Sequence, residues 1–222
     1  EVAGHPELPV GGVQEAHPDS SALYSWAVVL TGMASVGPPS DKSADLGRHV
    51  GNVMSMTTPV RTLVLLRHAK SDYPDGVADH ERPLAPRGIR EAALAGDWIS
   101  ANVGKVDAVL CSTATRTRET LARTGIEADI RYEDSLYDSR PGTVVDLVNG
   151  IGDGVETLLV VGHEPTTSSL AFALAGPGSD ADALQRMTQK YPTSAIAVLT
   201  TQLPWAQLEL GGSTLVDFHV PR

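Results

Sequence analysis

The sequence lacks several features that would each point to a particular class of protein. It has a single cysteine, Cys111, in 222 residues, which excludes an internal disulfide and any metal cluster held by several cysteines. No run reaches the roughly 18 apolar residues that a membrane span requires. The nearest run, residues 22–36, has no lysine or arginine before it, so it also lacks the basic start of a signal peptide. We therefore expect a cytoplasmic protein.

Basic residues are also in short supply. The chain has 17 lysines and arginines against 27 aspartates and glutamates, a formal net charge of -10. This balance argues against nucleic acid or an anionic membrane as the main partner. It leaves room for a local anion-binding pocket, because a few nearby groups set the field inside a pocket.

The first part of the chain differs in character from the rest. Residues 1–58 are rich in Gly, Pro, Ser and His and show no sustained helix or strand period. We interpret them as an N-terminal extension, mostly disordered or non-native, with one short helix at residues 22–31; a docking arm is the alternative. Met54 or Met56 could be a natural start. Residues 59–222 are predicted to form one folded domain.

From residue 61 onward, apolar strand patterns alternate with helical ones. This order predicts a three-layer α/β/α sandwich, with a mostly parallel central sheet and helices on both faces. The predicted strands are residues 61–66, 107–111, 157–161, 195–200 and 214–220, and the predicted helices are residues 88–101, 115–123, 143–149 and 166–175.

Three of these strands run directly into reactive polar residues. Arg67-His68 follows the first strand, the segment from Ser112 to Arg116 follows the second, and Gly162-His163 follows the third. Ligands of open parallel sheets bind at the carboxyl ends of the strands. We therefore expect two arginines and two histidines to meet at one rim of the sheet.

Two guanidiniums and two imidazoles suit a phosphoryl group. Arginine presents a fixed fork of donors that matches two phosphate oxygens and stays charged at working pH. A neutral imidazole nitrogen can attack phosphorus and form a covalent intermediate, which water then hydrolyses. The other ring nitrogen would donate to a backbone carbonyl and so hold the tautomer.

The same residues carry a family resemblance. Leu65-Leu66-Arg67-His68 resembles the Arg-His signature of the histidine phosphatase superfamily, also called the phosphoglycerate mutase-like family. Over about residues 61–221 the chain is similar to its small phosphohistidine phosphatase branch, the SixA type. The matching segments are Arg82-Pro83-Leu84 with Arg87-Gly88, Ser112, Arg116 and Thr120 in the spacing Ser-x-x-x-Arg-x-x-x-Thr, Gly162-His163-Glu164-Pro165, and residues 192–197.

The resemblance implies a role for each site residue. His68 would be the nucleophile that becomes phosphorylated, while Arg67, Arg116 and His163 would hold the phosphoryl oxygens. Arg82 and Lys70 are candidates for further substrate contacts at the mouth of the pocket. The resemblance implies no metal and no cofactor.

One departure from the family concerns the leaving group. Larger members carry a glutamate that protonates the leaving oxygen, and here only weaker candidates are present: Asp138, Glu81 and Asp72. An imidazole leaving group takes up a proton more readily than an alkoxide. The missing acid therefore favours a phosphoramidate such as phosphohistidine over a sugar phosphate, and it argues against a mutase.

The function expected from the sequence is that of a metal-independent phosphatase with a phosphohistidine intermediate, acting on protein phosphohistidine. One alternative is a phosphatase of small phosphorylated metabolites, which would share every catalytic residue. The other is a non-catalytic phosphate-binding module. The expected partner is accordingly a phosphorylated protein or a small phosphorylated metabolite.

Overall fold

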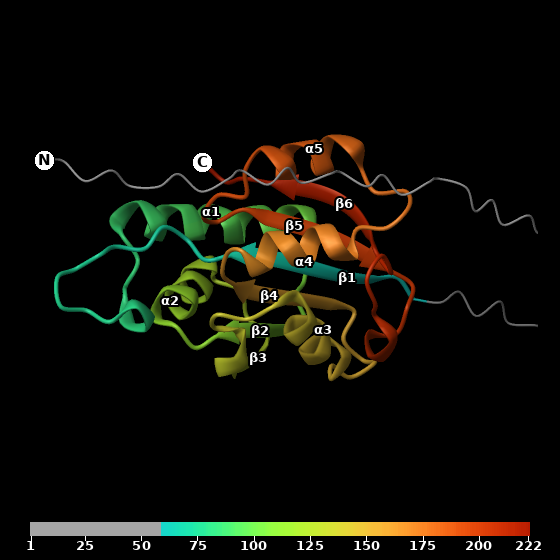
Figure 1. The fold of residues 1–222 in the computed structure, drawn as a ribbon, viewed down its shortest axis with the longest axis horizontal. Helices are drawn as coiled ribbons and strands as arrows, with labels where there is room; N and C mark the ends of the chain where they lie inside the picture. The colour runs from blue at the N-terminus through green and yellow to red at the C-terminus, as the bar shows by residue number, and fades with distance from the viewer. Residues whose placement is uncertain (1–58) are drawn as a thin grey trace, which may run out of the picture. The chain divides into compact units, whose positions relative to one another are not determined.

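The computed structural model describes residues 59–222 (Figure 1). The predicted extension over residues 1–58 and its helix at 22–31 lie outside the described residues. The strands are β1 (Arg61–Arg67), β2 (Ala108–Ser112), β3 (Asp129–Glu133), β4 (Thr157–Gly162), β5 (Ile196–Thr201) and β6 (Thr214–His219). The α-helices are α1 (Pro86–Asn102), α2 (Thr115–Thr124), α3 (Pro141–Asn149), α4 (Thr166–Leu174) and α5 (Ala181–Gln189), and short 3-10 turns occur at η1 (Asp79–Glu81), η2 (Asp134–Leu136) and η3 (Trp205–Gln207).

The strands form one sheet in the order β3-β2-β4-β1-β5-β6. Strands β3, β2, β4 and β1 are parallel to their neighbours, whereas β5 is antiparallel to both β1 and β6. Only β5 therefore runs against the other five strands, and the prediction of a mostly parallel sheet is confirmed. Within residues 59–222, no helix is long and apolar enough to cross a membrane.

Alternate residues of the central strands face two different helical layers. In β1, Leu63 and Leu65 pack in one core cluster with residues of α3, α4 and α5. Val64 and Leu66 pack in a second cluster with residues of α1 and α2. Both faces of β1 are buried because helices cover the sheet on both sides, which explains its uninterrupted apolar run. The predicted three-layer sandwich is confirmed.

Two elements escaped the sequence prediction. The edge strand β3 has the sequence DIRYE and is largely exposed, so it lacks the apolar run that marks the inner strands. Helix α5 begins at Asp180, whose carboxylate accepts a hydrogen bond from the Ala183 amide at 2.7 Å. It buries only Ala183 and Met187 against the core, which is too short a pattern to stand out in the sequence.

Glycine at residue 88 sets how closely α1 approaches the end of β1. A Cβ atom at Gly88 would collide with the backbone carbonyl of Lys70. The amide of Ala85, just before α1, donates to the same carbonyl at 2.9 Å. The close contact places the start of α1 directly beside the segment that follows Arg67 and His68.

Candidate active site

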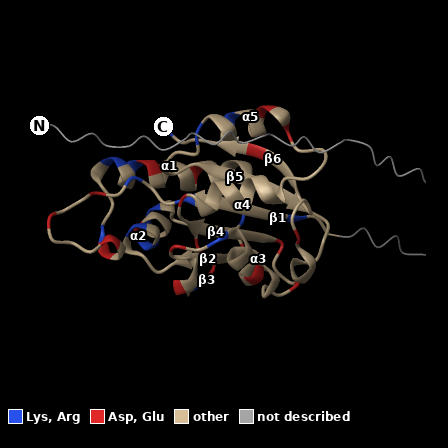
Figure 2. Ribbon diagram, viewed as in Figure 1, with Lys and Arg blue, Asp and Glu red and all other residues tan. Residues whose placement is uncertain are grey.

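The carboxyl ends of β1, β2 and β4 bring the two predicted histidines together. Arg67 of β1 pairs with Gly162 of β4, and the His68 amide donates to the Gly162 carbonyl at 3.0 Å. The ring centroids of His68 and His163 are 5.3 Å apart. The predicted convergence of these residues at one rim is therefore found in the structure. Figure 2 shows basic residues on α2 and at the start of α1, beside this end of the sheet.

His68 is held in one tautomer by its own backbone surroundings. Its Nδ1 lies 2.8 Å from the Ala69 carbonyl oxygen, which can only accept a hydrogen bond, so Nδ1 carries the proton. The Nε2 atom is consequently left with a free lone pair. The pKa of His68 is lowered to about 4, first by burial and then by the charges of Arg116 and Arg67. The ring is thus neutral over the physiological pH range.

His163 lies beside His68 and is also neutral. Its pKa is lowered to about 3, first by burial and then by the neighbouring His68 and Arg116. Its Nε2 is 2.8 Å from the hydroxyl oxygen of Ser112 at the end of β2. Its Nδ1 is buried without a hydrogen-bond partner among the described residues. His163 is therefore a neutral ring that can form a hydrogen bond with an oxygen atom of a ligand.

Arg67 reaches the same rim from the last position of β1. Its Nη1 donates to the Tyr191 carbonyl at 2.6 Å, and the Tyr191 hydroxyl donates back to the Leu65 carbonyl at 2.9 Å. Burial lowers the pKa of Arg67, and the charge of Glu164 partly opposes this. Arginine nevertheless keeps its charge in proteins, so Arg67 supplies a fixed cation beside His68.

Arg116 enters the site from the first turn of α2 and is only 5 % exposed. Thr120, one turn later, ties this helix to the nucleophile segment. Its hydroxyl donates to the Arg116 carbonyl at 2.6 Å and accepts from the Ala69 amide at 2.9 Å. The two residues of the predicted Ser-x-x-x-Arg-x-x-x-Thr segment thus have different tasks: Arg116 faces the site and Thr120 holds the backbone beside His68.

Two site residues were missed by the sequence prediction. The carboxylate of Asp79, in η1, is 3.2 Å from Nη2 of Arg116, and its backbone carbonyl accepts from Nη1 at 2.7 Å. The Tyr137 hydroxyl donates to the same carboxylate at 2.6 Å, and its ring meets that of His163 edge-on at 5.4 Å. Both residues lie on loops without a strand or helix period, so no pattern marked them.

The pKa of Asp79 reflects this cluster of donors. It is lowered to about 2, first by the hydrogen bond from Tyr137 and further by Arg82 and Arg116. In turn, the same hydrogen bond raises the pKa of Tyr137. Asp79 is therefore an ionised carboxylate that sits against the arginine expected to bind phosphate.

Arg82 and Lys70 lie further out. Arg82 donates through Nε to Asp79 at 2.9 Å and through Nη1 to the Ser71 hydroxyl at 2.7 Å. Its guanidinium lies 4.0 Å from the centre of the Tyr73 ring, and the Lys70 ammonium lies 5.2 Å from that ring. The structure places both cations around Tyr73, and only Arg82 joins the inner cluster, through Asp79.

The predicted acid candidates stand apart from the two histidines. Glu81 accepts hydrogen bonds from His80 and Thr115 at the surface. Asp138 is exposed, has a left-handed backbone with φ of 53°, and makes no hydrogen bond or ion pair in the part of the chain that the structure describes. Within residues 59–222, the Asp72 carboxylate accepts only from the Tyr73 amide. Of the aspartates and glutamates in the same part of the chain, Asp79 is the one that contacts Arg116.

Metal ligands do not gather at this site or elsewhere in the described chain. Residues 59–222 contain no group of three or more His, Cys, Asp and Glu side chains placed to hold a metal ion. The buried Cys111 has its pKa raised to about 12 by burial, so it remains a protonated thiol.

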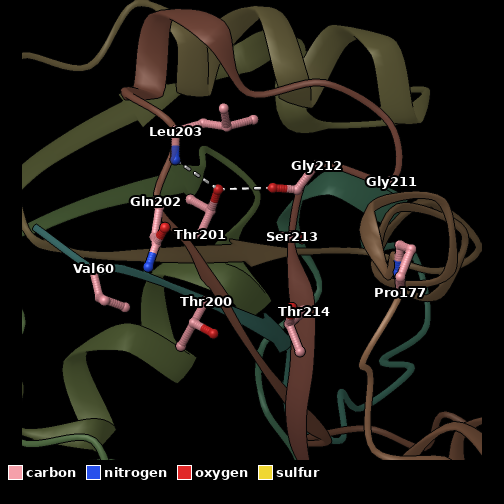
Figure 3. Close-up of a pocket in the computed structure, with 10 residues that line it drawn as sticks. All are labelled: Val60, Pro177, Thr200, Thr201, Gln202, Leu203, Gly211, Gly212, Ser213 and Thr214. Atoms are coloured by element: carbon pink, nitrogen blue, oxygen red, sulfur yellow. Dashed lines mark hydrogen bonds between the residues drawn. The ribbon is translucent and has the colours of Figure 1, made fainter. Parts of the chain in front are cut away.

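A cavity of 490 Å³ lies at the opposite end of the sheet, where β1 and β6 begin and β5 ends (Figure 3). Its wall includes Val60, Thr201 and Leu203. The Thr201 hydroxyl donates to the Gly212 carbonyl at 2.7 Å and accepts from the Leu203 amide at 3.1 Å. The residues that line this cavity carry no charged side chain, and none of the predicted site residues is among them.

Comparison with known proteins agrees with this geometry. The family model described as "Histidine phosphatase superfamily (branch 1)" matches residues 63–148. An uncharacterized protein of Mycobacterium tuberculosis is 63% identical over 158 residues, which are 71% of this chain and 100% of that relative. Phosphohistidine phosphatase SixA of Escherichia coli is 28% identical over 142 residues, 61% of this chain and 83% of that protein.

A solved structure supports the assignment more closely. The putative phosphohistidine phosphatase SixA from Nakamurella multipartitia is 39% identical, with a TM-score of 0.67, over 73% of this chain and 96% of that one. The 39% identity extends over nearly the whole of that structure, so the two chains share their sequence as well as their fold. The chain belongs to the histidine phosphatase superfamily, in its SixA-type branch, and is a phosphatase.

Proposed function

We propose that this phosphatase removes the phosphoryl group from protein phosphohistidine through a covalent intermediate on His68. The observation that carries the proposal is the state of His68. The ring is buried, it is neutral, and its Nδ1 is bound to the Ala69 carbonyl. The free lone pair on Nε2 lies beside His163, Arg67 and Arg116, which suits attack on a phosphoryl group.

In the first step, Nε2 of His68 attacks phosphorus and a new N–P bond forms. The bond between phosphorus and the leaving nitrogen breaks, and that nitrogen keeps the electron pair and takes a proton from solvent. Arg67 and Arg116 stabilise the charge on the equatorial oxygens, which is where most of the catalytic gain in phosphoryl transfer arises. His163 contributes a hydrogen bond to one of these oxygens.

In the second step, a water molecule attacks phosphorus on the phosphorylated His68. The N–P bond breaks, the electron pair returns to Nε2, and inorganic phosphate leaves with the oxygen of the water. The water's proton passes to phosphate or to solvent, so His68 ends the cycle neutral. The proton on Nδ1 of His68 stays on that nitrogen throughout and is donated in a hydrogen bond to the Ala69 carbonyl oxygen.

The choice of phosphohistidine rests on the leaving group. None of the carboxylic acids predicted as proton donors contacts the histidine pair within residues 59–222, and Asp79, the carboxylate nearest to Arg116, is ionised. An imidazole leaving group accepts a proton from water far more easily than an alkoxide does. The E. coli relative is named phosphohistidine phosphatase SixA, and this name supports the same choice of substrate. We place the activity in residues 59–222.

The test is to trap the intermediate and then to compare substrates. The full chain, incubated with a labelled phosphohistidine protein and quenched, should carry acid-labile label on His68, and His68→Ala should carry none and lose activity by at least about a thousandfold. His80→Ala, which removes an exposed histidine of the same loop region, is the matched control for labelling. Label that persists in His68→Ala would refute the nucleophile. Faster turnover of small phosphate esters than of phosphohistidine protein would refute the substrate.

A further inference from the structure

The carboxylate of Asp79 occupies the amino groups of Arg116 that a phosphoryl group needs. One donor atom, Nη1, is bound to the Asp79 backbone carbonyl at 2.7 Å, and the other, Nη2, lies 3.2 Å from its carboxylate. The remaining donor, Nε, is buried without a partner among the described residues. A two-point grip on phosphate uses a pair of such donors. Each amino nitrogen of Arg116 carries two N–H groups, so Asp79 engages part of the fork, and a phosphate that binds at Nη2 competes with the Asp79 carboxylate.

The reason for the occupancy is electrostatic. The Arg116 side chain is 6% exposed, and a guanidinium removed from water is costly unless an anion compensates it. Asp79 supplies that anion, with Tyr137 and Arg82 donating to its two carboxylate oxygens at 2.6 Å and 2.9 Å. The carboxylate thus gives Arg116 the negative charge that a phosphoryl group would also give it.

The segment that carries Asp79 can leave without disturbing the core. No residue of η1 is buried. Besides Asp79, η1 is attached by three contacts: a half-buried hydrogen bond between His80 and Thr113 at 3.2 Å, an exposed one from Thr115 to Glu81 at 3.3 Å, and an edge-on contact of the His80 and Tyr137 rings at 4.9 Å. Exposed polar contacts such as the second contribute little to stability. The displacement of Asp79 therefore costs mainly its own contacts with Arg116, Arg82 and Tyr137.

We propose that Asp79 is a positioning residue that competes with phosphate for Arg116 and so weakens the binding of the product. This inference rests on the proposed function, because it takes Arg116 to be a phosphate ligand. A dianionic phosphoryl group that also reaches Arg67 and the histidines displaces the carboxylate. Once the substrate protein has left, inorganic phosphate must still compete with the Asp79 carboxylate for Arg116. The phosphate therefore dissociates readily. Asp79 acts through Arg116 and does not itself react.

The experiment is calorimetric titration of inorganic phosphate into the full chain. Asp79→Asn keeps the backbone carbonyl and the size of the side chain but removes the competing charge, so the Kd for phosphate should fall about tenfold or more. The gain should shrink as salt is added, because it arises between charges. Asp75→Asn makes the same charge change in the same loop at an exposed position and should leave the Kd unchanged.

A second variant guards against a folding defect in Asp79→Asn. Tyr137→Phe removes the hydroxyl that holds the carboxylate but keeps the ring against His163, so it should also tighten phosphate binding, by a smaller factor. An unchanged or weaker affinity in Asp79→Asn, with a native circular dichroism spectrum, overturns the inference. If label still forms on His68, the proposed function survives that result. If neither the wild-type chain nor any variant binds phosphate, both proposals fall.

Discussion

The two ends of the sheet place a buried arginine in different surroundings. At the end where β1 begins, Arg61 is 6% exposed, and its guanidinium lies 3.5 Å from Asp153 and 3.4 Å from the Leu203 carbonyl. At the end where β1 finishes, the buried Arg116 is likewise paired with an exposed carboxylate, that of Asp79. Here, however, the charges of Arg116 and Arg67 also act on the buried, neutral ring of His68, which lies beside that of His163.

The difference separates a cavity from a reactive site. The 490 Å³ cavity lies at the quiet end, where the Thr201 hydroxyl pairs with neighbouring backbone groups (Figure 3). In the part of the chain that the structure describes, Nε of Arg61 is buried without a partner at the quiet end, whereas the reactive end has three such atoms on its site residues: Nε of Arg67, Nε of Arg116 and Nδ1 of His163. Unpaired buried donors are costly in a folded protein, and they mark the place where a ligand is expected.

The sharpest test of this contrast replaces one arginine at each end. Arg116→Ala should reduce kcat/KM on the order of a hundredfold, because it removes a preorganised donor that stabilises the transition state. This loss corresponds to about 3 kcal/mol of transition-state stabilisation. Arg61→Ala should lower stability but leave kcat/KM within about twofold, since Arg61 touches no site residue. Steady-state kinetics with a phosphohistidine protein measure both, and equal losses in the two variants would contradict the contrast.

The second prediction concerns the dependence of stability on pH. The pKa of His68 is lowered to about 4 in the folded protein, below the value of about 6.5 for an unfolded histidine. Between these values the unfolded chain binds the proton and the folded chain does not, so stability falls as the pH falls through this window. The wild-type chain should lose about 3 kcal/mol more unfolding free energy between pH 7 and pH 4 than His68→Gln does.

Urea unfolding at a series of pH values measures this difference. Thr201→Ser, a mild change at the quiet end of the sheet, is the control and should follow the wild-type pH profile. If His68→Gln also follows that profile, His68 is not the buried neutral histidine that the mechanism requires.

The smallest effects are expected from two buried threonines, one at each end. Thr120→Val and Thr201→Val each remove a hydroxyl that both donates and accepts a backbone hydrogen bond, so each should cost about 1 kcal/mol or somewhat more in stability. Only Thr120→Val should also reduce kcat/KM, by about tenfold or more, because it loosens the backbone beside His68. Melting temperatures and kcat/KM for both variants would expose a purely structural role for Thr120.

Much of the site could be predicted because its residues follow apolar strands. Arg67, His68 and His163 stand directly after runs that only a buried strand explains, and parallel strands bring such ends together. Arg116 and Thr120 are spaced by one helical turn. Asp79 and Tyr137 could not be predicted, since each lies on a loop whose path depends on how η1 and η2 pack.

The direction of β5 and the existence of β3 were also beyond the sequence. An apolar run has the same appearance in either direction, and β5 runs antiparallel because of where the chain returns after α5. Edge strand β3 is exposed along nearly its whole length and so carries no apolar run.

The order of most strands and helices, and the positions of the proposed nucleophile and its cationic partners, could be predicted from local sequence, because strand burial and helical spacing are short-range patterns. The tautomer of His68, the lowered pKa values of both histidines, and the presence of a carboxylate on Arg116 were decided only by the tertiary structure. These properties depend on burial and on charges brought together from β1, β4, α2 and η1, which lie far apart along the chain.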